Sequence, residues 1–160
     1  DITVERSLVD LSAITTATAE LSRALAENKR QTLTVAAAAP LEVEGDPDRL
    51  AEAIDNLVSN AMKYAPVGGE IRVEAVRQGD QARVTVCDSG PGLNQQDIVR
   101  LFGRFQRLSA QPTAGESSTG LGLSIVRKIV ELHDGEIVVE ESGPLGGASF
   151  SLLLPLLERR

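Results

Sequence analysis

Two asparagines and a lysine share one side of a helix that the sequence predicts over residues 48–64. At about 100° per residue, Asn56, Asn60 and Lys63 fall within an arc of roughly 60°. An amide oxygen is a suitable ligand for Mg²⁺, and a lysine can bind phosphate. A solvated polar face is the plain alternative, but asparagine prefers caps and turns to mid-helix positions. The pattern therefore invites a functional interpretation.

A turn-forming sequence, Asp-Ser-Gly-Pro-Gly over residues 88–92, follows directly on a predicted strand. These residue types are common in tight turns, which is the structural alternative. The functional hypothesis is that Asp88 accepts a hydrogen bond from the amino group of a ligand base. Gly90 and Gly92 would then let the backbone approach that ligand closely.

Two phenylalanines and two arginines lie close together ahead of a loop of small residues. They are Phe102, Arg104, Phe105 and Arg107, and residues 106–119 follow with almost no large apolar side chain. The end of an amphipathic helix is one interpretation. The other is a mobile flap, anchored by the phenylalanines, whose arginines reach a terminal phosphate.

Residues 118–123, Ser-Thr-Gly-Leu-Gly-Leu, open a predicted helix over residues 120–133. Free N–H groups and the helix dipole make such a start suitable for an anion. No Lys-Ser or Lys-Thr follows the glycines, so this is not a Walker A loop. The third glycine of a dinucleotide fingerprint is also missing. Taken alone, these glycines could be purely structural.

A single cysteine and a single histidine are both predicted to be structural. Cys87 has no partner for an internal disulfide and is expected to be a small core residue. His133 lies in the last turn of its helix, where a donor can meet the helix carbonyls. One histidine and one cysteine do not suffice for a zinc site.

The hydrophobic patterning predicts three main helices and about six strands in an α/β two-layer sandwich, with helices on one face of a mixed sheet. Residues 7–29 are predicted to form one amphipathic helix, because leucines and an isoleucine recur at three- and four-residue steps. A short helix is expected over residues 94–102. The predicted strands cover residues 32–36, 41–44, 70–77, 82–88, 136–141 and 148–154.

The composition indicates one globular domain, with 42% hydrophobic and 24% charged residues among 160. The net charge of −7 and the aromatic content of 2% oppose binding to nucleic acid. No apolar run approaches the ~20 residues of a membrane span, so no direct membrane contact is expected. Because the chain opens with Asp1 rather than methionine, we expect it to be a piece of a longer protein.

Taken together, these motifs resemble the catalytic and ATP-binding domain of sensor histidine kinases. That domain belongs to the GHKL ATPase superfamily (the Bergerat fold), with DNA gyrase, mismatch-repair ATPases and the ninety-kilodalton heat-shock chaperones. Residues 55–65 resemble its asparagine box, 88–93 and 119–126 its two glycine boxes, and 101–107 its phenylalanine box. The resemblance runs from about residue 41 to 155. It implies ATP and Mg²⁺ as ligands and a flexible ATP lid at about residues 102–120.

The resemblance also implies a role for each matching residue. Asn60 would bind Mg²⁺, and Asp88 would recognise the adenine amine. Arg107, or failing that Arg104, would approach the γ-phosphate. The remaining residues implied in nucleotide binding are Asn56, Lys63, Tyr64, Gly90, Gly92, Phe102, Phe105, Thr119, Gly120, Leu121, Gly122 and Leu123.

Asn56 bears on the type of reaction. Hydrolytic relatives carry glutamate at the equivalent position, and an amide cannot act as that base. We therefore expect transfer of the γ-phosphate to a protein histidine, with Asn56, Lys63 and the arginines in the catalytic site. Two departures from the family pattern are Ser118, in place of a glycine, and Gln106, in place of an aromatic residue.

No acceptor histidine precedes the predicted catalytic domain in this sequence. We expect the acceptor on a separate dimerisation and phosphotransfer domain, with a response regulator downstream. Residues 1–29 would be the junction to that domain, and residues 30–157 the catalytic domain. The isolated chain is expected to be monomeric, bacterial and cytoplasmic, whether or not its parent is membrane-anchored. The alternatives are a nucleotide-binding pseudokinase, an anti-sigma-factor-like serine kinase and a hydrolytic ATPase.

Overall fold

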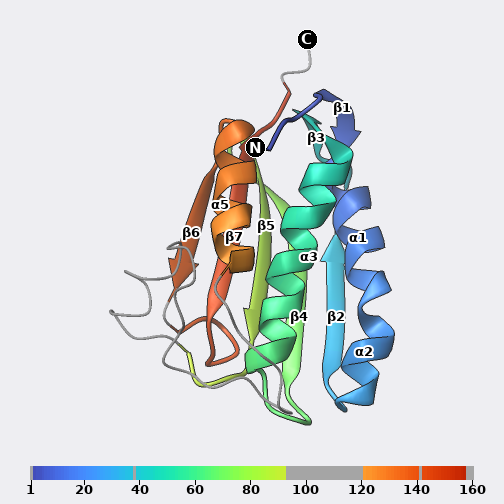
Figure 1. Cartoon of the computed structure of the whole chain (residues 1–160), viewed down its shortest axis with the longest axis vertical. Helices are drawn as coiled ribbons and strands as arrows, with labels where there is room; N and C mark the ends of the chain where they lie inside the picture. The colour runs from blue at the N-terminus through green and yellow to red at the C-terminus, as the bar shows by residue number, and fades with distance from the viewer. Residues whose placement is uncertain (1, 38, 93–120, 141, 158–160) are drawn as a thin grey trace.

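The computed structural model describes residues 2–37, 39–92, 121–140 and 142–157 (Figure 1). Its elements, in chain order, are β1 (Ser7–Asp10), α1 (Leu11–Leu21), α2 (Arg23–Asn28), β2 (Thr32–Ala37), β3 (Glu42–Gly45), α3 (Pro47–Tyr64), β4 (Glu70–Gln78), β5 (Gln81–Asp88), α5 (Leu121–Leu132), β6 (Glu136–Glu140) and β7 (Ser149–Pro155).

The main sheet is mixed and has five strands in the order β2-β4-β5-β7-β6. β2 pairs with β4 in parallel, and the other neighbours are antiparallel. Helices α1, α3 and α5 cover one face of this sheet (Figure 1). Strands β1 and β3 form a separate two-stranded ribbon. The predicted two-layer α/β sandwich is confirmed.

The β4–β5 hairpin follows the alternation seen in the sequence. Ile71, Val73 and Ala75 of β4 are fully buried, whereas the residues between them are not. In the register of the hairpin, Val73 lies opposite Val86 and Ile71 lies opposite Asp88. Because side chains alternate along a strand, Asp88 continues the buried series of β5 and points toward the helix-covered face.

Helix α3 has clear start and stop signals. The Asp46 carboxylate accepts hydrogen bonds from Asp48 N at 3.1 Å and Arg49 N at 3.2 Å, and Pro47 occupies the first helical position. The helix ends at Tyr64, and the C-cap residue Ala65 is extended ahead of Pro66. The apolar face of this helix is buried: Ile54, Leu57, Val58, Ala61 and Met62.

The prediction of one helix over residues 7–29 is wrong. Residues 7–10 form strand β1, which pairs with β3, and the helical segment is interrupted at Ser22. Asp10 caps α1 by accepting from Ser12 N, so the helix begins only at Leu11. The apolar spacing was misleading because three of its leucines are 65%, 83% and 61% exposed: Leu8, Leu21 and Leu25. The buried side of α1 consists of Leu11 and four smaller residues: Ser12, Thr15, Thr18 and Ala19.

The two lone residues have structural roles, as predicted. His133 is buried; its Nδ1 donates to Ile129 O at 2.8 Å, and its Nε2 accepts from Asp46 N at 3.0 Å. It therefore joins the end of α5 to the start of α3. Cys87 is buried, with its sulfur 3.5 Å from Ser149 Oγ.

The helix predicted over residues 94–102 lies outside the described residues. Within the described part of the chain, no helix is long and apolar enough to cross a membrane.

Candidate functional site

Three elements bring the predicted site residues to one end of the sheet. The C-terminal halves of α3 and β5 run toward the same end, and α5 begins on that side (Figure 1). α3 carries Asn56, Asn60 and Lys63, all of which are half-buried. Asp88 ends β5. The structure therefore brings the first and second sequence motifs together.

Asp88 is the most strongly perturbed acid of the site. Its side chain is only 2% exposed, and Oδ1 accepts from Gly90 N at 2.8 Å. Burial raises the pKa of this carboxyl to about 6, against 3.8 in water, although hydrogen bonds from the backbone N–H groups of Gly90 and Ala148 act in the opposite direction. A buried acceptor with a perturbed pKa is a common mark of a functional site.

Two glycines form a close-fitting cradle around the Asp88 carboxylate. A Cβ atom on Gly90 would lie 2.5 Å from Tyr64 O. On Gly147 it would lie 2.5 Å from Gly90 N and would also collide with the Asp88 carboxylate. Gly147 N donates to Asp88 O at 3.0 Å, which ties the β6–β7 connection to the end of β5. The backbone surrounds Asp88 in a way that only glycine allows.

Gly147 is a candidate site residue that the sequence did not indicate. It lies between the strands predicted over residues 136–141 and 148–154, where the local sequence predicts no more than a turn. Its contact with Asp88 spans 59 positions of the chain, and nothing in the local sequence indicates it. The adjacent glycines, Gly146 and Gly147, were the one available signal, because a single glycine suffices for most turns.

The other candidate residues that the structure describes differ in position, backbone conformation and burial. Tyr64 ends α3 and is buried. Gly92 has φ of 80°, a conformation that favours glycine. Leu121 and Gly122 lie in the first turn of α5. The Leu123 side chain belongs to the hydrophobic core, so a contact between Leu123 and a ligand would have to use its backbone.

Six candidates of the predicted lid and its hinge lie outside the described residues. They are Phe102, Arg104, Phe105, Arg107, Thr119 and Gly120. Ser118, Gln106 and the lid interval of about 102–120 lie outside them as well.

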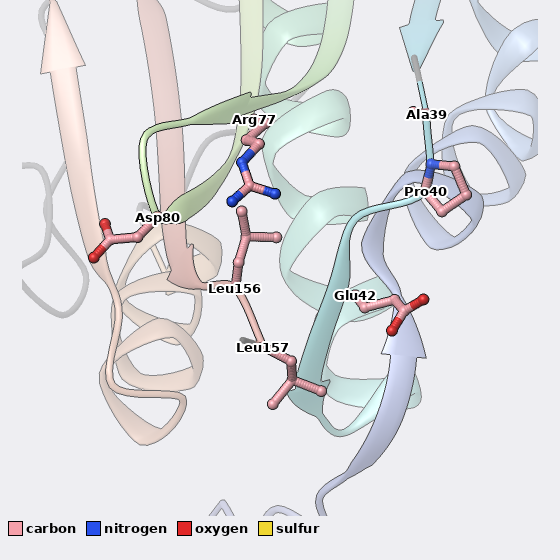
Figure 2. A pocket seen from close by; sticks show the side chains of 7 residues that line it. All are labelled: Ala39, Pro40, Glu42, Arg77, Asp80, Leu156 and Leu157. Atoms are coloured by element: carbon pink, nitrogen blue, oxygen red, sulfur yellow. The ribbon is translucent and has the colours of Figure 1, made fainter. Parts of the chain in front are cut away.

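A separate cavity of about 590 Å³ lies at the other end of β5 from Asp88 (Figure 2). It is lined by Ala39, Pro40, Glu42, Arg77, Asp80, Leu156 and Leu157. Asp80 directly precedes β5 and Asp88 ends it, so this cavity is at the opposite end of the strand. Among the predicted site residues that the structure describes, none lines it.

The polar side chains at the Asp88 end of the sheet fit an adenine nucleotide with a divalent cation. The Gly90–Gly147 cradle holds a carboxylate acceptor suited to an amino group. Amide oxygens from Asn56 and Asn60 are hard ligands, and Lys63 adds a cation for phosphate. The described residues contain no group of three or more His, Cys, Asp or Glu side chains able to hold a metal. A cation here would therefore depend on amide, phosphate and water oxygens.

Comparison with known proteins agrees with this architecture. Residues 45–158 match the family described as Histidine kinase-, DNA gyrase B-, and HSP90-like ATPase. Over 148 residues the chain is 40% identical to the sensor histidine kinase TmoS of Ectopseudomonas mendocina; the match covers 92% of this chain and 15% of that protein.

Solved structures give the same result. The mycobacterial sensor histidine kinase MprB has a TM-score of 0.82 at 27% identity, covering 96% of this chain and 100% of that one. Full-length ShkA in complex with AMPPNP has a TM-score of 0.81 at 27% identity, covering 99% of this chain and 32% of that one.

The chain therefore belongs to the histidine kinase-, DNA gyrase B- and HSP90-like ATPase family. Within that family it is similar to the catalytic ATPase domain of sensor histidine kinases, and it has their ATP-binding fold. It spans 15% of the length of TmoS.

Proposed function

We propose that this chain binds ATP with Mg²⁺ and transfers the γ-phosphate to a histidine on a separate dimerisation and phosphotransfer domain. The observation that carries the proposal is the buried Asp88 carboxylate within its glycine cradle. A buried carboxylate does not improve hydrophobic packing at this position. An adenine amine, in contrast, would donate a hydrogen bond to the Asp88 carboxylate. The ShkA complex with AMPPNP, a relative of the same fold, supports a nucleotide as the ligand.

Asp88 and the glycines would select the base. Above pH of about 6 the Asp88 carboxyl is ionised and can only accept hydrogen bonds, so it favours an amino group over a carbonyl. That preference distinguishes adenine, which carries an exocyclic amine, from guanine, which has a carbonyl oxygen at the equivalent ring position. Gly90 and Gly92 would allow the ring to approach the backbone.

The polar side of α3 would hold the phosphates and the metal. Asn60 supplies an amide oxygen for Mg²⁺, Lys63 supplies positive charge, and Asn56 lies one turn before Asn60. Bound Mg²⁺ would neutralise charge on the transferring phosphoryl group. Tyr64 would contribute to the wall of the nucleotide site. Arg107, with Arg104 as the second choice, would supply a further cation from the lid.

Asn56 favours transfer over hydrolysis, because its amide cannot remove a proton from water. In the proposed reaction the bond between the γ-phosphorus and the bridging oxygen breaks, and ADP leaves with its electron pair. A nitrogen of the acceptor imidazole forms the new bond to phosphorus. The chain's own contribution is then to position the reactants and to neutralise charge.

The acceptor domain, the response regulator and a cytoplasmic location belong to this proposal. The relatives named as sensor histidine kinases support this part of the proposal. The chain matches only 15% of TmoS and 32% of ShkA, so those proteins contain further segments in which an acceptor domain could lie. His133 is not a candidate acceptor, because it is buried and both ring nitrogens are hydrogen-bonded.

The test joins this chain to a histidine-bearing dimerisation hairpin of a sensor kinase and supplies γ-labelled ATP with Mg²⁺. We expect label on the hairpin that survives base and is lost in acid, as phosphohistidine chemistry requires. A hairpin with glutamine in place of the acceptor histidine should take none. Acid-stable label would indicate a serine kinase, release of free phosphate alone an ATPase, and nucleotide binding without turnover a pseudokinase. Each of these three results would contradict the proposal.

A further inference from the structure

The last turn of α3 is held from outside the helix by a glutamine that precedes β2. Gln31 is 4% exposed, and its Nε2 donates to Met62 O at 3.0 Å and to Ala65 O at 3.0 Å. The final carbonyls of an α-helix have no partner within the helix. One side-chain amide therefore satisfies two carbonyls at this helix end.

The segment around Gln31 fastens the same helix end through its backbone and through Lys29. Thr32 N donates to Gly69 O at 2.9 Å, and Gly68 N donates to Lys29 O at 3.4 Å. Lys29 Nζ also donates to Met62 O. The start of β2 is thus bound both to the end of α3 and to the turn that follows it.

This helix end forms one wall of the candidate nucleotide site. Lys63 and Tyr64 belong to the last turn of α3. The Tyr64 carbonyl lies so close to Gly90 that a Cβ on Gly90 would be 2.5 Å from it. Gly90 N in turn donates to Asp88 Oδ1. A shift of the last turn of α3 would therefore move the backbone against the cradle of Asp88.

We propose that Gln31 is a positioning residue for nucleotide binding: by donating to Met62 O and Ala65 O, it sets the last turn of α3 against Gly90. This inference rests on the proposed function. Within the described ranges, the Gln31 side-chain oxygen is buried without a hydrogen-bonding partner. An unpaired buried acceptor is destabilising, and an apolar side chain of equal length would avoid it. That side chain would, however, lack the two N–H donors.

The first test is Gln31→Met, which keeps the length of the side chain and removes both donors. Tyr64 is the single tyrosine and the chain has no tryptophan, so tyrosine fluorescence reports directly on the last turn of α3. We expect a changed Tyr64 emission and a roughly tenfold weaker affinity for ATP, at a temperature where far-ultraviolet circular dichroism shows the variant folded.

The matched control is Ser12→Ala. Ser12 is also buried, and its hydroxyl donates to Ala39 O at 3.0 Å. This bond joins the start of α1 to the segment after β2, and both of these element ends lie at the other end of the sheet (Figure 1). This variant should lose stability but keep the Tyr64 emission and the ATP affinity. If Gln31→Met does not fold, Gln31→Asn replaces it, because the amide is retained but withdrawn by one methylene. The same two readouts then apply.

The outcomes separate the inference from the proposed function. Wild-type chain that binds no adenine nucleotide contradicts the proposed function. Wild-type binding together with an unchanged affinity in the Gln31 variant overturns the role of Gln31 alone. An equal loss of affinity in Ser12→Ala also overturns it, because general destabilisation would then suffice.

Discussion

Asp88→Asn should stabilise the fold while it weakens nucleotide binding. At pH 7 the buried carboxyl is ionised although its pKa of about 6 lies above the 3.8 expected in water. At about 1.36 kcal/mol for each pH unit, this interval corresponds to about 3 kcal/mol by which ionisation disfavours the folded state. An amide of the same shape can still accept from Gly90 N and carries no charge. We therefore expect up to about 3 kcal/mol of added stability, or roughly 6 to 12 °C in Tm.

The pH dependence fixes the sign of this effect. The folded state binds the Asp88 proton more tightly than the unfolded state does. The resulting stability is fully present below pH of about 4 and is lost as the pH rises through about 6. The difference in free energy of unfolding between wild type and Asp88→Asn should therefore be small at pH 4.5 and largest above pH 7. Urea denaturation at a series of pH values measures it.

Binding should respond in the opposite direction. The carboxylate accepts from the adenine amine as a charged group, and loss of such a bond removes about 1.5–3 kcal/mol, or roughly 10- to 150-fold in affinity. Wild-type affinity should itself fall as the pH is lowered through about 6. The control Asp80→Asn makes the same chemical change in the β4–β5 turn. It should change neither the stability nor the nucleotide affinity as much as Asp88→Asn does. A lower Tm in Asp88→Asn, or wild-type affinity, would refute the reasoning.

Three further predictions concern the metal, the cradle and the helix cap. Asn60→Ala should remove the Mg²⁺-dependent part of ATP binding and leave the metal-free part, as measured by calorimetry; identical Mg²⁺ dependence would show that the metal is held elsewhere. Gly147→Ala should lower both Tm and ATP affinity, because its Cβ collides with the Asp88 carboxylate and lies 2.5 Å from Gly90 N; normal binding would exclude Gly147 from the site. Asp46→Ala should cost about 1–2 kcal/mol in urea denaturation without changing affinity, since it loses the cap of α3 and the bond from Glu5 N. These backbone hydrogen bonds, of which the one from Glu5 N has the largest effect, lower the pKa of Asp46. The contribution of Asp46 to stability should therefore be present at neutral pH and fade as the pH falls below about 4. A difference in stability between wild type and Asp46→Ala that persists in acid would contradict this.

The sequence predicted those features of the fold that depend on the residues of a single element. These features are where a helix begins and which face of a hairpin is buried. Asp46 and Pro47 define the start of α3, and alternation defines the buried face of the β4–β5 hairpin. The candidate site residues on α3 and β5 are apparent in the sequence because unusual residue types, such as mid-helix asparagines, stand out within a regular pattern. Their assigned roles remain predictions.

Contacts between residues that are distant along the chain could not be predicted from local sequence patterns. The contact of Gly147 with Asp88 and the bonds of Gln31 to α3 join segments that are distant along the chain. In residues 7–29 the error has a different origin. Three leucines of the apolar stripe, Leu8, Leu21 and Leu25, are largely exposed, and β1 forms because β3 provides a pairing partner. Tertiary context overrides periodicity there.

The central claim is that the Asp88 end of the sheet is an adenine-nucleotide site that depends on Mg²⁺. Calorimetric titration of the chain with a non-hydrolysable ATP analogue, with and without Mg²⁺, tests it most directly, with ADP and GTP as comparisons. We expect metal-dependent binding of the ATP analogue and of ADP, and none of GTP. Absence of binding at any accessible concentration, or equal binding of GTP, would contradict the account.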